Sequence, residues 1–312
     1  MTTTPVVTAF APASVGNVIV GFDILGHSVD AVGDRVTARR IPEPVVRITA
    51  ITGTDAELPL EAEKNTAGRA LIAMREAQQL PFGFEISIQK GIPLGSGLGG
   101  SAASAVAAVV AANALLDEPL PKLELLKFAM AGEAVASGSA HVDNIAPSLF
   151  GGLVLTVGVD HPRTKQIPVP ESIRAVLVHP HMFLSTREAR GVLSKNVTLS
   201  DLVWQCANLA GFISACYTDD LAMMRDAFED VVIEPQRARL IPGFAEVKAA
   251  AMELGALGCS ISGAGPTVLA WCEAPQAEAI RAAMVAAFQK HGLESDAWIS
   301  SLGAAGARVE AA

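Results

Sequence analysis

The chain has 312 residues, enough for one large domain or two ordinary ones, and 51% of them are apolar, which predicts a full hydrophobic core. The net charge of −9 argues against a nucleic-acid-binding protein, because such proteins usually present a basic face. No membrane partner is expected either. The first residues lack a signal-peptide pattern, and the longest apolar stretch, 102–116, is shorter than the roughly 18 residues of a membrane span. These features indicate a soluble cytoplasmic protein.

The first half of the chain alternates between strand and helix patterns. Apolar residues at every second position, or in short runs, predict strands at 5–10, 17–22, 34–41, 45–51, 82–90 and 151–157. Helical spacing predicts helices at 65–80, from Ser101 to about residue 116, and at 121–137. Residues 157–172 then contain three prolines and few apolar side chains, which is typical of a domain boundary or a surface hairpin. We therefore expect domains at 1–160 and 161–312.

The second half repeats this mixture. Strands are predicted at 174–180, 258–262, 267–272 and 305–310, and helices at 199–228, 243–256 and 275–292. Strands and helices follow one another irregularly, and several strand pairs have the short connections of antiparallel neighbours. The pattern favours an α+β fold over a doubly wound parallel sheet.

The stretch "KGIPLGSGLGGS" at 90–101 contains the spacing G-x-G-x-x-G of a dinucleotide-binding loop. In a dinucleotide-binding fold the first glycine ends a strand, and an acidic residue ends the next strand. Here the strand ends near Gln89, and five residues separate it from the first glycine of the pattern, Gly95. The acidic Asp117 and Glu118 precede a proline in a loop. The dinucleotide interpretation is therefore weak, and a Walker A loop is excluded because the required lysine is absent.

A third interpretation is a loop that holds the phosphates of ATP. Gly95, Gly97, Gly99 and Gly100 allow tight turns that aim successive N–H groups at an anion. Ser101 then opens a helix whose free N–H groups and dipole also favour negative charge. Because the loop carries no cation, the neutralising charge has to come from Mg²⁺ and from elsewhere in the fold.

Three segments in order resemble the motifs of the GHMP family of small-molecule kinases. They are "APASVGNVIVGFDILG" at 11–26, "PLGSGLGGSAAS" at 93–104 and "SISGAGPTVLA" at 260–270. The resemblance implies an amino-terminal domain like domain 2 of ribosomal protein S5 and a ferredoxin-like carboxy-terminal domain. The phosphate-binding residues that it implies are Gly91, Ile92, Pro93, Leu94, Gly95, Ser96, Gly97, Leu98, Gly99, Gly100 and Ser101. The supporting glycine turn that it implies consists of Ser262, Gly263, Ala264 and Gly265. Gly100 stands where the family often has a serine.

Further segments, at 137–152, 185–193, 233–244 and 304–309, resemble the branch of this family that phosphorylates L-homoserine, a step toward threonine. The implied reaction takes ATP with Mg²⁺ and a small amino-acid substrate, and a homodimer is a further expectation. The substrate contacts that the resemblance implies are Asn17, Asp23, His141, Asn144, Arg190 and Arg237. Guanidinium groups suit the carboxylate of the substrate, and Asp23 suits its ammonium group.

The resemblance also implies the remaining roles. Glu133, with the hydroxyl oxygen of Ser101, is expected to bind Mg²⁺, and Thr186 to position the hydroxyl or the γ-phosphate. Asn65 resembles the adenine contact of the family, although asparagine at a helix start is also a common cap. Asp143 aligns with the catalytic base of galactokinase and mevalonate kinase. The homoserine branch implies transfer without an obligate base, which the loose transition state of phosphoryl transfer permits.

Two other functions remain open from the sequence. One is a kinase of the same family for another small alcohol. The other is a nucleotide-binding regulator that senses a metabolite without turning it over; it would not need the metal-binding pair Ser101 and Glu133.

Overall fold

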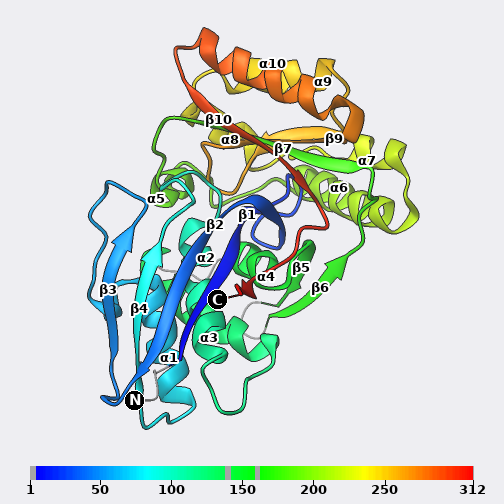
Figure 1. Ribbon diagram of the computed structural model, residues 1–312. Coiled ribbons are helices and arrows are strands. Elements are labelled where there is room, and N and C mark those ends of the chain that lie inside the picture. Colours follow the sequence, from blue (N-terminus) through cyan, green and yellow to red (C-terminus); the bar gives the residue numbers. More distant parts are fainter. Residues whose placement is uncertain (1–4, 138–141, 159–161, 312) are drawn as a thin grey trace.

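The computed structural model describes residues 5–137, 142–158 and 162–311. Within these ranges the chain forms a seven-stranded mixed sheet and a four-stranded antiparallel sheet, with helices packed on both (Figure 1). The α+β class expected from the sequence is confirmed. In the same ranges no helix is both long and apolar enough to cross a bilayer.

The first sheet has the strand order β11-β1-β2-β4-β3, and β5 extends it by pairing with both β2 and β6. Its strands are β1 (Val6–Gly16), β2 (Leu25–Ile41), β3 (Val46–Thr52), β4 (Gly83–Gln89), β5 (Leu153–Val157), β6 (Arg163–Ile167) and β11 (Arg308–Val309). The helices of this part are α1 (Thr66–Ala77), α2 (Gly100–Asn113), α3 (Lys122–Ser137) and α4 (Val142–Phe150), and a 3₁₀ turn at Ala62–Lys64 precedes α1.

Helix α2 lies at the centre of this part. It contacts β1 and β2 as well as α1, α3 and α4, and every residue from Ala102 to Ala112 is buried. A helix that is apolar on all sides has to be enclosed, and small side chains let its neighbours approach closely. The packing around α2 therefore fixes the position of its N-terminus, where the glycine loop ends.

The second sheet has the order β10-β7-β9-β8, with all pairs antiparallel. Its strands are β7 (Ile173–Pro180), β8 (Gly258–Ile261), β9 (Val268–Glu273) and β10 (Ser295–Ser301). Helices α9 (Phe244–Glu253) and α10 (Ala277–Lys290) cover its outer face (Figure 1). The order β7-α9-β8-β9-α10-β10 is the ferredoxin-like β-α-β-β-α-β arrangement, as expected.

The segment between β7 and α9 adds further helices beside the second sheet. They are α5 (Thr186–Gly191), α6 (Leu199–Thr218), α7 (Leu221–Ala227) and α8 (Glu234–Arg237), followed by a 3₁₀ turn at Ala238–Leu240. A last 3₁₀ turn, Ala274–Gln276, leads into α10. Of these, α5 matters most for the site, because it enters the space between the two sheets (Figure 1).

The inner face of the second sheet packs into the core of the first part. Along β7, Ala175 and Leu177 belong to the core built around α2, whereas Val176 and Val178 belong to the core beneath α9 and α10. Side chains alternate across a strand, so one strand serves both cores. The domain boundary expected near residue 160 stays a prediction. The first sheet includes β6, which ends at Ile167, and β11 near the end of the chain, which pairs with β1.

The strand expected at 17–22 is wrong. Strand β1 continues to Gly16, and the chain then turns through Asn17, Val18 and Ile19, whose φ angles are 71°, 39° and 59°. Left-handed conformations at three non-glycine residues are unfavourable, and the surrounding structure has to hold them in place. The side-chain amide of Asn17 supplies one such restraint by donating to the Gly263 carbonyl at 2.8 Å. β10 and residues 25–33 of β2 are strands that the sequence patterns did not predict.

A buried imidazole joins the two sheets. The Nδ1 atom of His27, on β2, lies 3.0 Å from the Ser28 carbonyl, and its Nε2 accepts from the indole N–H of Trp271, on β9, at 3.4 Å. Burial is the main cause that lowers the pKa of His27 to about 4, and the bond to Ser28 opposes it. The ring is therefore neutral at pH 7 and remains able to accept from Trp271.

This arrangement predicts acid sensitivity. The unfolded chain binds a proton at His27 near pH 6.5 but the folded chain only near pH 4, so the unfolding free energy is unaffected above pH 6.5 and falls as the pH drops toward 4. For this one group the loss between pH 7 and pH 4.5 is about 2 kcal/mol. The unfolding free energy measured with urea should differ less between the two pH values in His27→Gln than in wild type. An unchanged difference in His27→Gln would contradict the assignment.

Candidate active site

The protein itself holds the carbonyl groups of the glycine loop. The four carbonyls of residues 95–98 accept from Leu184 N (3.3 Å), Thr267 N (3.1 Å), Ser262 Oγ (2.7 Å) and Ser14 N (3.1 Å), in that order. Among the described residues, none accepts a hydrogen bond from the N–H groups of residues 95–100. Gly95, Gly97 and Gly99 have φ angles of 63°, 76° and 64°, which L side chains rarely adopt. The loop thus keeps its N–H groups for an external anion.

A buried ion pair supports the loop at both ends. Asp34 Oδ1 accepts from the N–H groups of Gly91 (3.0 Å) and Ile92 (3.2 Å), where the loop begins. Lys90 Nζ pairs with the other oxygen of Asp34 and donates to the Gly100 carbonyl at 2.8 Å, where the loop ends. Asp34 and Lys90 therefore hold the first and the last residues of the loop in fixed positions relative to one another.

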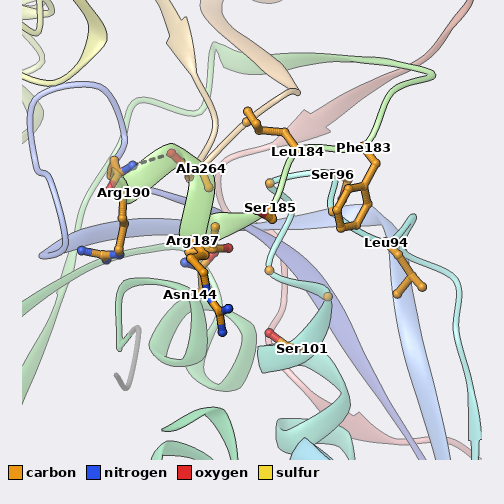
Figure 2. Close-up of a pocket in the computed structure, with 18 of the residues that line it drawn as sticks. Leu94, Ser96, Ser101, Asn144, Phe183, Leu184, Ser185, Arg187, Arg190 and Ala264 are labelled. Atoms are coloured by element: carbon orange, nitrogen blue, oxygen red, sulfur yellow. Dashed lines mark hydrogen bonds between the residues drawn. The ribbon is translucent and has the colours of Figure 1, made fainter. Parts of the chain in front are cut away.

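The loop forms one wall of a cavity of about 680 Å³, with α4, α5 and the glycine turn as further walls (Figure 2). This volume is ordinary for a site that binds small molecules. The predicted site residues that line it are Asn17, Asp23, Pro93, Leu94, Gly95, Ser96, Gly97, Gly99, Gly100, Ser101, Glu133, Asp143, Asn144, Thr186, Arg190, Arg237, Gly263, Ala264 and Gly265.

A few predicted residues do not line this cavity. Ile92 and Leu98 are buried beneath the loop, and Gly91 bonds to Asp34. Ser262 is also buried, and its hydroxyl holds the Gly97 carbonyl, so it supports the loop. His141 lies outside the described residues.

Opposite charges meet at one end of the cavity. The Nη1 and Nη2 atoms of Arg190 donate to the two carboxylate oxygens of Asp23 at 3.1 and 2.6 Å. The family motifs imply that these groups bind the carboxylate and the ammonium of a substrate separately, whereas the structure brings them together as a bidentate pair. Both side chains are partly exposed, 34% for Arg190 and 40% for Asp23, so a ligand can reach them.

Arg237 lies deeper than Arg190. Its Nε and Nη1 donate to the carbonyls of Ala189 (3.0 Å) and Gly263 (2.9 Å). Burial, followed by the charge of Arg190, lowers the pKa of Arg237 to about 10, and nearby carboxylates including Asp23 oppose the shift. The group therefore remains a cation at neutral pH and makes this end of the cavity attractive to a carboxylate.

Helix α4 brings two polar residues to the cavity. Asp143 is buried and its Oδ2 accepts from the Asn17 N–H at 3.2 Å, while the Asn144 Oδ1 accepts from the Ser14 hydroxyl at 3.1 Å. Asn17 uses its own side-chain oxygen to accept from the Asp23 N–H at 3.1 Å. These bonds connect the first motif, α4 and the glycine turn into one framework around the cavity.

Ser101 and Glu133 lie side by side at the end of the glycine loop. The Ser101 hydroxyl donates to Glu133 Oε1 at 2.9 Å, and Glu133 is 4% exposed. Hydroxyl and carboxylate oxygens are ligands that Mg²⁺ accepts, usually one or two of them together with phosphate oxygens and water. Groups of three or more His, Cys, Asp or Glu suited to a metal are absent from the described ranges. The pair therefore fits a cation that is shared with bound phosphates.

Asn65 caps a helix. Its Oδ1 accepts from the N–H groups of Ala67 (3.0 Å) and Gly68 (3.3 Å) at the start of α1, and its Nδ2 donates to the Pro59 carbonyl. It does not line the cavity described above. The adenine contact stays a prediction, and the capping role accounts for the asparagine at this position.

Several cavity residues had no predicted role. Phe22 lies beneath two arginines of the cavity, with ring-to-guanidinium distances of 5.5 Å for Arg190 and 5.3 Å for Arg237. Phe183 is 68% exposed at the edge of the cavity, and Arg187 also lines it. Phe22 lies in the motif at 11–26 and Arg187 in the segment at 185–193. Their position within these family motifs is the sequence feature that could have indicated a role in the site.

The fold and the loop geometry agree with comparisons to known proteins. Models of the GHMP kinases N terminal domain and of the GHMP kinases C terminal match residues 65–152 and 212–290. Homoserine kinase of Xanthomonas campestris pv. campestris is 54% identical over 96% of this chain and 93% of its own length. The chain belongs to the GHMP kinase family. The family resemblance seen in the sequence motifs is thus confirmed.

Other members of the GHMP kinase family extend this similarity. Homoserine kinase of Chlorobaculum tepidum is 42% identical over 97% of this chain and 98% of its own length. The crystal structure of homoserine kinase from Cytophaga hutchinsonii superposes with a TM-score of 0.96, at 42% identity and 99% coverage of both chains. Galactokinase of Lactococcus lactis, with a TM-score of 0.69 and 16% identity, shares the fold.

Proposed function

We propose that this enzyme transfers the γ-phosphoryl group of ATP to the side-chain hydroxyl of L-homoserine, giving O-phospho-L-homoserine and ADP. One observation carries the proposal: an anion-binding loop and a charge pair suited to an amino acid line the same cavity. The near-complete coverage by relatives named homoserine kinase supports the choice of acceptor.

The glycine loop binds the phosphates of ATP. Its carbonyls are held by the protein, so its N–H groups and the N-terminus of α2 face the anion. Ser101 and Glu133 would hold Mg²⁺, which supplies charge neutralisation at the phosphate oxygens when it is bound. Thr186, at the start of α5, lies across the same cavity and positions the acceptor hydroxyl or the γ-phosphate.

The Asp23–Arg190 pair matches the zwitterion of an amino acid. A bound substrate places its ammonium at Asp23 and its carboxylate at Arg190 and Arg237, so each charge of the internal pair is met by an opposite charge. Asn17 and Asn144 border the same space and contact the amino-acid backbone or hydroxyl. His141 is proposed as a further contact on the strength of the motif alone. The cytoplasm, which supplies both ATP and free amino acids, is the proposed location, and a homodimer stays a prediction.

The reaction proceeds without an obligate base. The bond between the γ-phosphorus and the bridging oxygen breaks, its electron pair goes to ADP, and the homoserine oxygen forms the new bond to phosphorus. In a loose transition state the hydroxyl proton leaves late, and a phosphoryl oxygen or water can accept it. Asp143, which is held by the Asn17 N–H, then contributes electrostatically and orients the loop that bears Asn17.

Asp143→Asn is therefore expected to keep measurable turnover. Removing an obligate base typically costs 10²- to 10⁴-fold, and we expect a fall in kcat of less than about 30-fold. Steady-state kinetics with ATP and L-homoserine measures this, with Glu133→Gln as the comparison that should lose more. A folded, ATP-binding Asp143→Asn variant without turnover would show that the base is required.

Product analysis tests the proposed reaction directly. The protein is incubated with MgATP and L-homoserine, and the products are identified by phosphorus NMR and mass spectrometry. We expect ADP and O-phospho-L-homoserine in equal amounts. ADP formed with inorganic phosphate alone would mean that the protein hydrolyses ATP and that the acceptor assignment is wrong.

A further inference from the structure

Arg187 is a cationic side chain in the cavity to which neither the motifs nor the proposed function gives a role. It lies on α5, is exposed and lines the cavity together with Ser101 and Asn144. Figure 2 shows its side chain extending from α5 into the cavity, on the side of Asn144 and Ser101. Within the described ranges no carboxylate pairs with it.

The other two arginines of the cavity already have protein partners. Arg190 makes a bidentate pair with Asp23, and Arg237 donates to the carbonyls of Ala189 and Gly263. Lys90, the nearest lysine in sequence to the glycine loop, is buried beneath it and pairs with Asp34. Among the described residues, Arg187 is thus the arginine of the cavity whose guanidinium has no hydrogen-bond or ion-pair partner, so it can donate to a ligand.

The base of Arg187 is fixed relative to the glycine loop. The Leu184 N–H donates to the Gly95 carbonyl at 3.3 Å, and the Ser185 hydroxyl caps α5 by accepting from the Glu188 N–H at 3.1 Å. The first turn of α5, which contains Arg187, is therefore attached to the same loop that receives the phosphates. A long side chain from this point reaches the space between the loop and α4.

We propose that Arg187 is a catalytic residue that contacts the transferred phosphoryl group and stabilises its charge in the transition state; this rests on the proposed function. The glycine loop lacks the lysine of a Walker A loop, so a cation is needed opposite it. A planar guanidinium donates to two phosphoryl oxygens at once. Arg187 acts through its charge and its hydrogen bonds alone: the γ-phosphorus exchanges the ADP oxygen for the homoserine oxygen, and the hydroxyl proton leaves to a phosphoryl oxygen or water.

The test compares Arg187→Ala, Arg187→Lys and a control, Arg225→Ala. Arg225 is an exposed arginine on α7 that does not line the cavity. For Arg187→Ala we expect kcat to fall roughly 100-fold, with the KM for L-homoserine and the affinity for ADP within about threefold of wild type. Arg187→Lys should recover part of the loss, because it restores the charge without the paired donors, and Arg225→Ala should match wild type.

A second readout does not depend on the acceptor. ADP with Mg²⁺ and fluoroaluminate mimics the transferring phosphoryl group, and it should protect wild type against thermal unfolding more than ADP with Mg²⁺ does. Arg187→Ala should lose this additional protection and keep the protection by ADP. If the protein instead phosphorylates another alcohol, the proposed acceptor fails while the fluoroaluminate readout still tests Arg187.

Three results would overturn the proposal. A kcat within threefold of wild type, with the fluoroaluminate protection retained, would leave Arg187 without a role in transfer. A loss confined to the KM for L-homoserine would make Arg187 a ligand of the substrate carboxylate. An equal loss of ADP and fluoroaluminate binding would mean that Arg187 contacts the non-transferred phosphates or supports the loop.

Discussion

Gly97→Ala is expected to lower kcat/KM by at least about 100-fold, which corresponds to about 3 kcal/mol of transition-state stabilisation. Gly97 has a φ of 76°, and a β-carbon there would lie 2.7 Å from the Gly265 carbonyl oxygen and still closer to that of Ser262. The loop would have to move away from the glycine turn. The hydrogen bonds to the carbonyls of residues 95–98 would then be lost or distorted, and the N–H groups of the loop would no longer be positioned to bind the phosphates.

A matched control separates this effect from backbone strain. Gly255 has a φ of 88° with no neighbouring atom within 4 Å of an added β-carbon, so Gly255→Ala carries only the conformational cost, about 1 kcal/mol of stability. Its kcat/KM should equal that of wild type. Ser262→Ala, which removes the 2.7 Å bond to the Gly97 carbonyl without a collision, should give an intermediate loss of activity. Wild-type kcat/KM in a folded Gly97→Ala variant would contradict the assignment of the loop.

Replacing one partner of the buried Asp34–Lys90 pair is expected to produce the largest loss of stability. The Lys90 side chain is 4% exposed and that of Asp34 is fully buried. Lys90→Met leaves a buried carboxylate without its cation, which typically costs 3–5 kcal/mol. ATP affinity should also fall, roughly 10- to 100-fold, because Lys90 holds the Gly100 carbonyl and Asp34 holds the first amides of the loop.

Urea unfolding of the single and double variants measures the coupling between these two residues. The double variant Asp34→Asn, Lys90→Met should lose less stability than the sum of the single variants, because neither residue then remains as an unpaired buried charge. Lys127→Met serves as the control. It removes an exposed partner of Glu124 on α3 and should change stability by no more than about 0.5 kcal/mol. Additive losses at Asp34 and Lys90 would show that the pair does not act as a unit.

The glycine loop could be predicted from the sequence as a candidate anion-binding site, because glycines at alternate positions before a helix are typical of a backbone that turns its amides toward an anion. The motifs also indicated the charged residues Asp23, Arg190 and Arg237, which line the same cavity as the loop, since each falls inside one of the motifs. They did not show that Asp23 and Arg190 bind one another, because these residues are 167 positions apart and only the folded chain brings them together. For the same reason the tethering of the loop by Leu184 and Thr267 could not be predicted.

Local patterns failed where tertiary contacts set the backbone. Residues 17–22 have the composition of an apolar strand, but their backbone forms a left-handed turn that is unfavourable for these residue types. The hydrogen bond from the Asn17 side chain to the Gly263 carbonyl helps to hold this turn. His27 had no predicted role, because its partner Trp271 is 244 residues away. The Asp34–Lys90 ion pair beneath the loop could not be predicted either. A lysine before a glycine-rich stretch resembles a solvent-exposed charge, and only the folded chain brings Asp34 next to it.

The most direct test of the proposed function is ADP release from MgATP with L-homoserine, mevalonate, galactose or no acceptor, in wild type and in Arg190→Ala. We expect release that depends on L-homoserine alone and a large loss in Arg190→Ala, because that variant lacks the guanidinium that faces the substrate carboxylate. Release with another acceptor would contradict the substrate assignment and leave the phosphate loop in place. ATP binding without release for any acceptor would contradict the enzymatic function itself.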